Sequence, residues 1–104
     1  MVKLISLMKR KDGMSREEFA RWAVEEHARI AERMPDIRQY RINVVRSDQP
    51  ETEFDGAFEL WFDNIEALQA ALDSAVGTEA REDALAHASK RIHLRTEEHI
   101  IIAV

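Results

Sequence analysis

The sequence predicts a single α+β domain over residues 1–104, with a ferredoxin-like βαββαβ order and a four-stranded antiparallel sheet. Segments of strand and helix periodicity follow one another as strand, helix, strand, strand, helix, strand. The length of 104 residues suits one domain. A composition that is 45% hydrophobic and 34% charged is typical of a globular chain rather than a disordered one.

The first helix has the clearest signal. Ser15 and Glu18 form a capping box, so the helix is expected to begin after Ser15. His27 falls at one edge of its apolar stripe, and Pro35 ends the helix. The stripe, at spacings of three and four, consists of Phe19, Trp22, Ala23, Ile30 and Met34.

Four segments predict the strands. Val2–Met8 and His99–Val104 are apolar on both parities, which is typical of strands buried on both faces. Ile37–Val45 and Phe54–Phe62 alternate, and each is bounded by turn residues. In the third strand one face carries Phe58, Leu60 and Phe62, and the other carries Ala57, Glu59 and Trp61.

A second helix is expected after Asn64. Gly77 is expected to end or interrupt it, and a further helical stretch then runs from about Thr78 to Ser89. Two helices can cover only one face of a four-stranded sheet. The apolar surplus on the other face predicts a homodimer, in which two sheets form a dimeric α+β barrel with a pocket in each half.

Composition excludes several classes of function. The net charge of −5 argues against a nucleic-acid-binding surface, and the absence of cysteine excludes disulfides and thiolate chemistry. The apolar run Leu4–Met8 is too short for a membrane span or a signal peptide, so we expect a soluble, cytoplasmic protein with no membrane partner. The four histidines form no metal-binding pair, and no glycine-rich nucleotide loop is present, so no metal and no cofactor are expected.

His27 and Glu59 are the first two candidates for chemistry. His27 can act as a general acid or base, or bond a ligand hydroxyl; alternatively it is a helix-edge histidine bonded to a backbone carbonyl or to solvent. Glu59 lies in an otherwise apolar strand. If its face lines the barrel interior, its pKa should be raised; alternatively that face meets water and Glu59 pairs with an arginine of the neighbouring strand.

Tyr40 is the third catalytic candidate, because a hydroxyl on an apolar body suits a pocket wall. Asn43 lies on the opposite parity of the same strand. Trp61 is either core or a ligand platform. His87 and His93 are expected near element ends, in solvent. The candidate substrate-pocket residues are Trp22, Trp61, Asn43 and His99.

Four short matches run in order along nearly the whole chain. They are Val2–Ile5 through Lys9–Lys11 before Ser15–Phe19; His27-Ala28 followed by Pro35 and Tyr40; Phe54–Gly56 before Glu59–Phe62; and Thr96–His99. On these residues the chain resembles the EthD-like proteins of the dimeric α+β barrel superfamily. The resemblance implies a homodimer and a pocket between sheet and helices, lined by His27 and Tyr40.

The same resemblance implies a range of activities. Some members accompany ether-degrading oxygenases, and similar barrels isomerise lactones, oxidise or decarboxylate aromatic polyketides, or cyclise polyketide chains without a cofactor; related barrels can also hold haem on one histidine. The chain departs from its relatives at Ala23, where an aromatic residue is frequent, and at Arg29, where proline is common. These departures prevent the transfer of any particular substrate.

The leading hypothesis is a cofactor-independent enzyme, of oxygenase, isomerase or cyclase type, that acts on a hydrophobic aromatic or lactone-like metabolite. His27 would transfer the proton, while Tyr40 and Glu59 orient the substrate. The alternative is a non-catalytic protein that binds a small hydrophobic molecule or serves an oxidative degradation pathway. A third possibility is a dimeric scaffold with a vestigial pocket.

Overall fold

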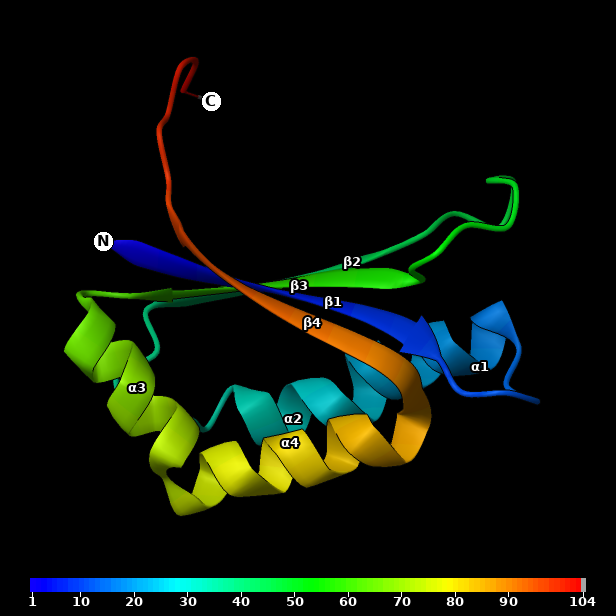
Figure 1. Ribbon diagram of the computed structural model, residues 1–104, viewed down its shortest axis with the longest axis horizontal. Helices are drawn as coiled ribbons and strands as arrows, with labels where there is room; N and C mark the ends of the chain where they lie inside the picture. The colour runs from blue at the N-terminus through cyan, green and yellow to red at the C-terminus, as the bar shows by residue number, and fades with distance from the viewer. Residues whose placement is uncertain (104) are drawn as a thin grey trace.

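A four-stranded sheet lies over a layer of helices in the computed structural model, which describes residues 1–103 (Figure 1). The elements are β1 (Val2–Arg10), α1 (Arg16–Arg21), the π-helix η1 (Trp22–His27), α2 (Ala28–Ala31), β2 (Gln39–Val44), β3 (Gly56–Phe62), α3 (Ile65–Asp73), α4 (Ala75–His87) and β4 (Ala88–Glu97). The ferredoxin-like α+β class expected from the sequence is confirmed.

The strand order is β2-β3-β1-β4, and every neighbouring pair is antiparallel. Leu4 of β1 faces Leu60 of β3 on one side and Arg95 of β4 on the other. This register places alternate residues of β1 and β3 toward the helices, where they are buried. The opposite surface, which we call the open face, has no helix against it (Figure 1).

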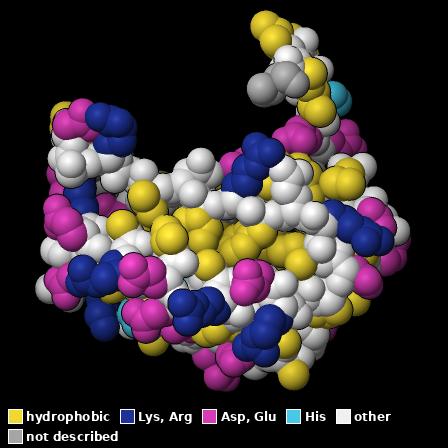
Figure 2. Space-filling model, turned by 180° about the vertical axis from the view of Figure 1, so that it is seen from behind, with side chains coloured by type: hydrophobic (Ala, Val, Ile, Leu, Met, Phe, Trp, Pro, Cys, Tyr) yellow, Lys and Arg dark blue, Asp and Glu magenta, His cyan; other side chains and the backbone are white. Residues whose placement is uncertain are grey.

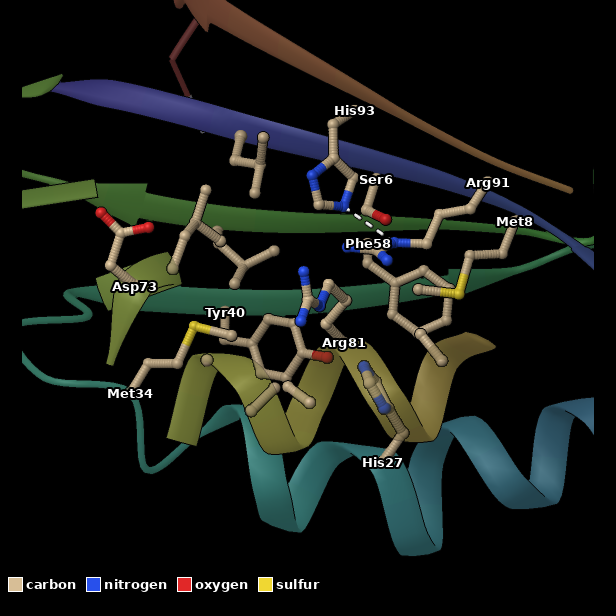
Figure 3. Close-up of a pocket in the computed structure, with 17 residues that line it drawn as sticks. Ser6, Met8, His27, Met34, Tyr40, Phe58, Asp73, Arg81, Arg91 and His93 are labelled. Carbon is tan, nitrogen blue, oxygen red and sulfur yellow. Dashed lines mark hydrogen bonds between the residues drawn. The ribbon is translucent and has the colours of Figure 1, made fainter. Parts of the chain in front are cut away.

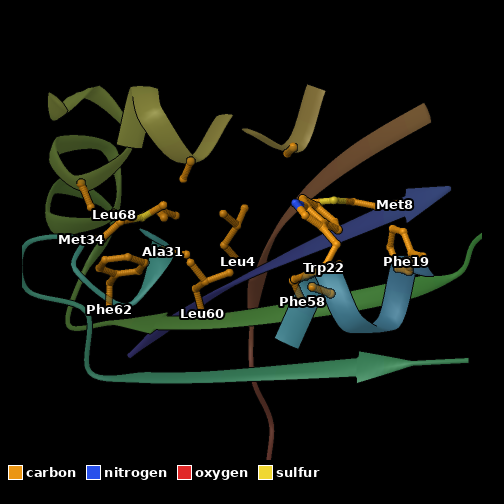
Figure 4. Close-up of a cluster of buried hydrophobic side chains, with 14 residues drawn as sticks. Leu4, Met8, Phe19, Trp22, Ala31, Met34, Phe58, Leu60, Phe62 and Leu68 are labelled. Atoms are coloured by element: carbon orange, nitrogen blue, oxygen red, sulfur yellow. The ribbon is translucent and has the colours of Figure 1, made fainter. Parts of the chain in front are cut away.

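The hydrophobic core fills the space between the sheet and the helices (Figure 4). Leu4 and Phe58 come from the sheet, and Phe19 and Trp22 come from the first helical run; all four are at most 2% exposed. The rings of Phe19 and Trp22 lie 5.5 Å apart between centroids. This aromatic packing fixes the first helical run against the sheet.

The first helical run begins as the sequence predicts. The side chain of Ser15 accepts a hydrogen bond from the backbone N–H of Glu18 at 3.1 Å, and Glu18 accepts one from the backbone N–H of Ser15 at 3.0 Å. The run then widens into η1 before it continues as α2. The wider π turn buries Trp22, Ala23 and His27 together, and such turns occur frequently at functional sites.

The break between the last two helices lies at Ser74, not at Gly77. Ser74 ends α3, and its side chain accepts a hydrogen bond from the backbone N–H of Gly77 at 3.0 Å, which caps α4. Gly77 therefore lies inside the first turn of α4. There it permits a close approach, because a Cβ at this position would lie 2.3 Å from the carbonyl oxygen of Ala71.

The prediction of a last strand at His99–Val104 is wrong, because β4 ends at Glu97. The apolar run Ile100–Ile102 is instead an exposed tail that stands away from the body of the molecule (Figures 1 and 2), and Val104 lies outside the described residues. β4 lacks the apolar pattern of a buried strand, because its face toward the helices carries Arg91, His93 and Arg95.

The open face combines apolar and charged side chains. Ile5 and Leu7 of β1 lie beside Leu94 and Ile92 of β4, and Leu94 is 44% exposed. Figure 2 shows, from behind, a further band of hydrophobic side chains across the middle of the molecule. In the part of the chain that is described, no helix has the length and apolarity needed to cross a membrane.

Candidate functional site

A cavity of about 210 Å³ lies between the helix-covered side of the sheet and the helices (Figure 3). The strands contribute Ser6 and Tyr40 to its wall, η1 contributes His27, and α4 contributes Arg81. Its apolar lining includes Leu4, Met8, Met34, Phe58, Leu60 and Ala84. The cavity is therefore mostly apolar with a few convergent polar groups, which is typical of a small-molecule site.

His27 is held by Asp83 of α4. Nδ1 of His27 lies 2.9 Å from Oδ2 of Asp83, and the same oxygen accepts a hydrogen bond from Nε1 of Trp22 at 3.1 Å. A carboxylate can only accept, so the proton of a neutral His27 resides on Nδ1. Nε2 has no hydrogen-bond partner among residues 1–103, and its lone pair is left for a ligand in the cavity.

The environment of His27 keeps the imidazole neutral. The residue is 5% exposed, and this burial lowers its pKa. The Asp83 carboxylate opposes the shift, while the positive charge of Arg91 adds to it. The net effect is a pKa below the ordinary value of about 6.5, so Nε2 is a proton acceptor at neutral pH.

Aromatic rings fix the orientation of His27. Trp22 lies 4.9 Å from its ring, and Phe58 meets it edge-on at 5.7 Å. The ring of His87 also stacks on the indole of Trp22, with 4.6 Å between the ring centroids. Nδ1 of His87 lies 2.7 Å from the backbone carbonyl oxygen of Asp83. His87 is therefore half-buried against Trp22, instead of lying freely in solvent as expected.

Tyr40 reaches the cavity from β2, and Figure 3 shows it on the same side of the cavity as His27 and Arg81. Burial raises the pKa of its hydroxyl, and the negative charge of Glu32 raises it further. Tyr40 therefore stays protonated at any physiological pH. Its hydroxyl can donate a hydrogen bond to an oxygen of a ligand in the cavity.

A cationic group occupies the part of the cavity wall formed by α4 and β4. It comprises the two cations Arg81 and Arg91 and the neutral ring of His93, and Nε of Arg91 donates a hydrogen bond to Nε2 of His93 at 3.0 Å. His93 is exposed, as expected, but it lies in the middle of β4 and lines the cavity instead of lying near a strand end. Burial of the ring and the charges of Arg91 and Arg95 lower its pKa to about 4.

Glu59, Asn43 and Trp61 do not line this cavity. All three lie on the open face, where Glu59 forms an ion pair with Lys3 and accepts a hydrogen bond from Nδ2 of Asn43 at 2.8 Å. Burial acts to raise the pKa of Glu59, but the bonds from Lys3 and Asn43 outweigh it and lower the pKa. Of the two possibilities open for Glu59, the structure favours the paired carboxylate, although its partner is Lys3 of β1 instead of an arginine.

The other two pocket candidates also lie outside the cavity lining. Trp22 packs behind His27 and bonds Asp83, so it supports the wall without forming it. His99 follows β4 in the exposed tail, with Nε2 3.9 Å from Glu97. Nε1 of Trp61 donates a hydrogen bond at 3.0 Å to Glu98, which anchors the base of that tail.

The sequence does not reveal Asp83, which holds His27 from behind the cavity wall, or the polar cavity residues Ser6, Asp73, Arg81 and Arg91. Asp83 precedes His87 by one helical turn, and an acidic residue at that spacing is the one available signal. The positions of Arg91 and His93 on the cavity wall are missed because the predicted last strand begins at His99, whereas β4 begins at Ala88. Within residues 1–103, no group of three or more His, Asp and Glu side chains is placed to hold a metal ion.

Comparison with known families matches residues 11–90 to the EthD domain. Among solved structures, an ethyl tert-butyl ether D (EthD) family protein of Bacillus halodurans is 27% identical, with a TM-score of 0.81 over 95% of this chain and 99% of that one. No match was found among curated proteins.

More distant structures share the fold. A DABB family protein with a ferredoxin-like fold from Mesorhizobium loti is 13% identical, with a TM-score of 0.73 over 94% of this chain and 96% of that one. A dimeric ferredoxin-like protein of unknown function from Thermobifida fusca is 12% identical, with a TM-score of 0.73 over 91% of this chain and 88% of that one.

Proposed function

This chain belongs to the EthD family, and from that premise we propose that its cavity binds a small, largely hydrophobic molecule and transfers a proton at it without a cofactor. The observation that carries this proposal is the His27–Asp83 pair, because it presents a neutral imidazole of defined tautomer to the cavity. Of the three catalytic candidates, His27 and Tyr40 line that cavity and Glu59 does not.

The chemistry follows from the two side chains. Nε2 of His27 accepts a proton from a carbon next to a carbonyl group of the ligand. The Tyr40 hydroxyl, held protonated, donates a hydrogen bond to the oxygen on which negative charge develops. Asp83 stabilises the imidazolium that forms, so the proton can be returned to another carbon or oxygen of the same ligand.

The size and lining of the cavity restrict the ligand. Ligand pockets commonly measure roughly 300–1,000 Å³, and this cavity of about 210 Å³ lies below that range. The apolar lining and the small volume favour a single-ring aromatic or lactone-like molecule. Such a ligand would exclude water from the His27 side of the cavity, which strengthens the hydrogen bonds made there.

Proton exchange is the direct test. Single-ring aryl ketones and lactones are incubated with the protein in D2O, and loss of the proton next to the carbonyl is followed by NMR. We expect His27→Gln to abolish the protein-dependent exchange, whereas His99→Gln in the exposed tail leaves it unchanged. Exchange that survives His27→Gln would rule out this base, and tight binding without exchange would favour the non-catalytic alternative.

We further propose that the protein works as a homodimer through the open face. Ile5, Leu7 and Leu94 give that face an apolar centre that no helix or strand within residues 1–103 covers. Similar folds from Thermobifida fusca and Jannaschia are described as dimeric. A partner sheet placed on this face would also enclose the Lys3–Glu59 ion pair.

A further inference from the structure

Arg81 and Arg91 face the cavity without a carboxylate partner among residues 1–103. Several other arginines have a carboxylate partner, for example Arg10 with Asp55 and Arg33 with Glu79. What sets Arg81 and Arg91 apart from the arginines without one is that both line the same cavity. Burial, together with the positive charge of Arg81, lowers the pKa of Arg91. Arg81 is exposed and Arg91 is half-buried, so an anion bound between them would gain two positive charges that no carboxylate among residues 1–103 neutralises.

Ser6 provides a second, independent observation that points to a ligand. It is 3% exposed, and its hydroxyl has no hydrogen-bond partner in the described part of the chain. Ser6 lines the cavity directly across from His93 in the β1–β4 register. A buried hydroxyl is normally paired, so an unpaired one at a cavity wall indicates a group that a bound molecule completes.

His93 contributes a donor rather than a charge. Its Nε2 atom accepts the hydrogen bond from Arg91, so the proton of the neutral ring resides on Nδ1. The lowered pKa of His93 agrees with this neutral form. The group therefore offers two guanidinium forks, an imidazole N–H and a hydroxyl to the same cavity.

The acidic residue of the cavity lies elsewhere. Asp73 lines the cavity from the end of α3, and Figure 3 shows it at the opposite end from Arg91 and His93. A ligand with one negative group would therefore have one favourable orientation. Its charged end would lie by the arginines, and its apolar end would extend away from them.

We propose that the cavity selects small molecules that carry a carboxylate, bound by Arg81, Arg91, His93 and Ser6. The planar guanidinium fork matches the two oxygens of a carboxylate, so one arginine can bind it through two parallel hydrogen bonds. This inference rests on the proposed function, because it assumes that the cavity is the ligand site. It narrows the substrate class from hydrophobic ring compounds to hydrophobic ring acids.

Benzoate and its neutral isostere benzamide provide the test. Binding is measured by calorimetry, and by tryptophan fluorescence in a Trp61→Phe background, in which Trp22, beside His27, is the one remaining tryptophan. We expect benzoate to bind roughly tenfold or more tightly than benzamide. Raising the salt concentration should weaken benzoate binding and leave benzamide binding unchanged. Equal affinity for the two probes would overturn the inference while leaving the proposed function in place.

Two charge-removing variants and one matched control locate the site. Arg81→Gln and Arg91→Gln should each weaken benzoate binding roughly tenfold, and neither should change benzamide binding. Arg29→Gln removes the same charge from an exposed position of α2 that does not line the cavity, and should have no effect. Benzoate binding that survives both cavity variants would overturn the inference. Failure of both probes to bind would overturn it together with the proposed ligand site.

Discussion

Nδ1 of His27 lies 2.9 Å from Oδ2 of Asp83, although the two residues are 56 positions apart in the chain. The pair joins η1 to α4 across the helical layer, so it forms only when α4 packs against η1. It also decides which imidazole nitrogen faces the cavity. The pair is thus both a packing contact and the element that prepares the proposed base.

NMR of the imidazole nitrogens should find His27 with its proton on Nδ1 and a pKa below about 6.5, because burial disfavours the charged ring. Asp83→Asn removes the charge that favours the imidazolium, so it should lower the pKa further and lower the exchange rate roughly 100-fold. Asp48→Asn, at an exposed position that does not line the cavity, is the matched control. A His27 pKa that is unchanged in Asp83→Asn would contradict this positioning role.

Stability should decrease on the acid side of neutrality. The pKa of His27 is lower in the folded protein than in the unfolded chain, so the unfolded chain binds the proton first as the pH falls through about 6.5. The contribution is therefore fully present above that pH and is lost below it. His93, with a pKa lowered to about 4, acts in the same direction.

Urea unfolding of the wild type and His27→Gln, measured between about pH 8 and pH 5, checks this dependence. The variant should show a flatter curve than the wild type, because it lacks the titrating group. His99→Gln should retain the wild-type curve, since His99 is exposed in the tail. Parallel curves for the wild type and His27→Gln would show that His27 does not carry the effect.

Local sequence signals predicted most of the fold. The capping box at Ser15 and the alternation around Phe58 depend on near neighbours in the chain, and the structure forms both as expected. The last strand could not be predicted in the same way. β4 borders the cavity, so polar residues occupy the side of the strand that would otherwise be apolar. The exposed tail at Ile100–Ile102 has the apolar composition typical of a buried strand, and this favoured the wrong segment.

The candidate site was predicted only in part for a related reason. His27 and Tyr40 carry their own signals, a titratable or hydroxyl side chain on an apolar face. Asp83 carries no such signal, because an acidic residue on a polar helix is ordinary until the fold places it against His27. Glu59 was assigned to a pocket because the strand parity that faces the helices depends on tertiary packing, which the alternation does not reveal.

Gly77→Ala should strongly destabilise the fold. A Cβ at this position would lie 2.3 Å from the carbonyl oxygen of Ala71 and 2.4 Å from that of Leu72, and neither backbone atom can move without opening the α3–α4 junction. We expect a loss of roughly 2–4 kcal/mol in the free energy of unfolding, measured by urea titration. Gly13→Ala, at a φ of +83° in open space, should cost about 1–2 kcal/mol. Equal losses would contradict the steric argument.

Leu94→Glu should convert the proposed dimer to a monomer, as measured by analytical ultracentrifugation. Leu94 lies in the apolar part of the open face, and a carboxylate there would be buried without a partner against the second copy. Leu85→Glu makes the same change at a leucine of α4 that is 59% exposed on the helical side, so it should leave the dimer intact. Dissociation by Leu85→Glu but not by Leu94→Glu would place the interface on the helices instead of the sheet.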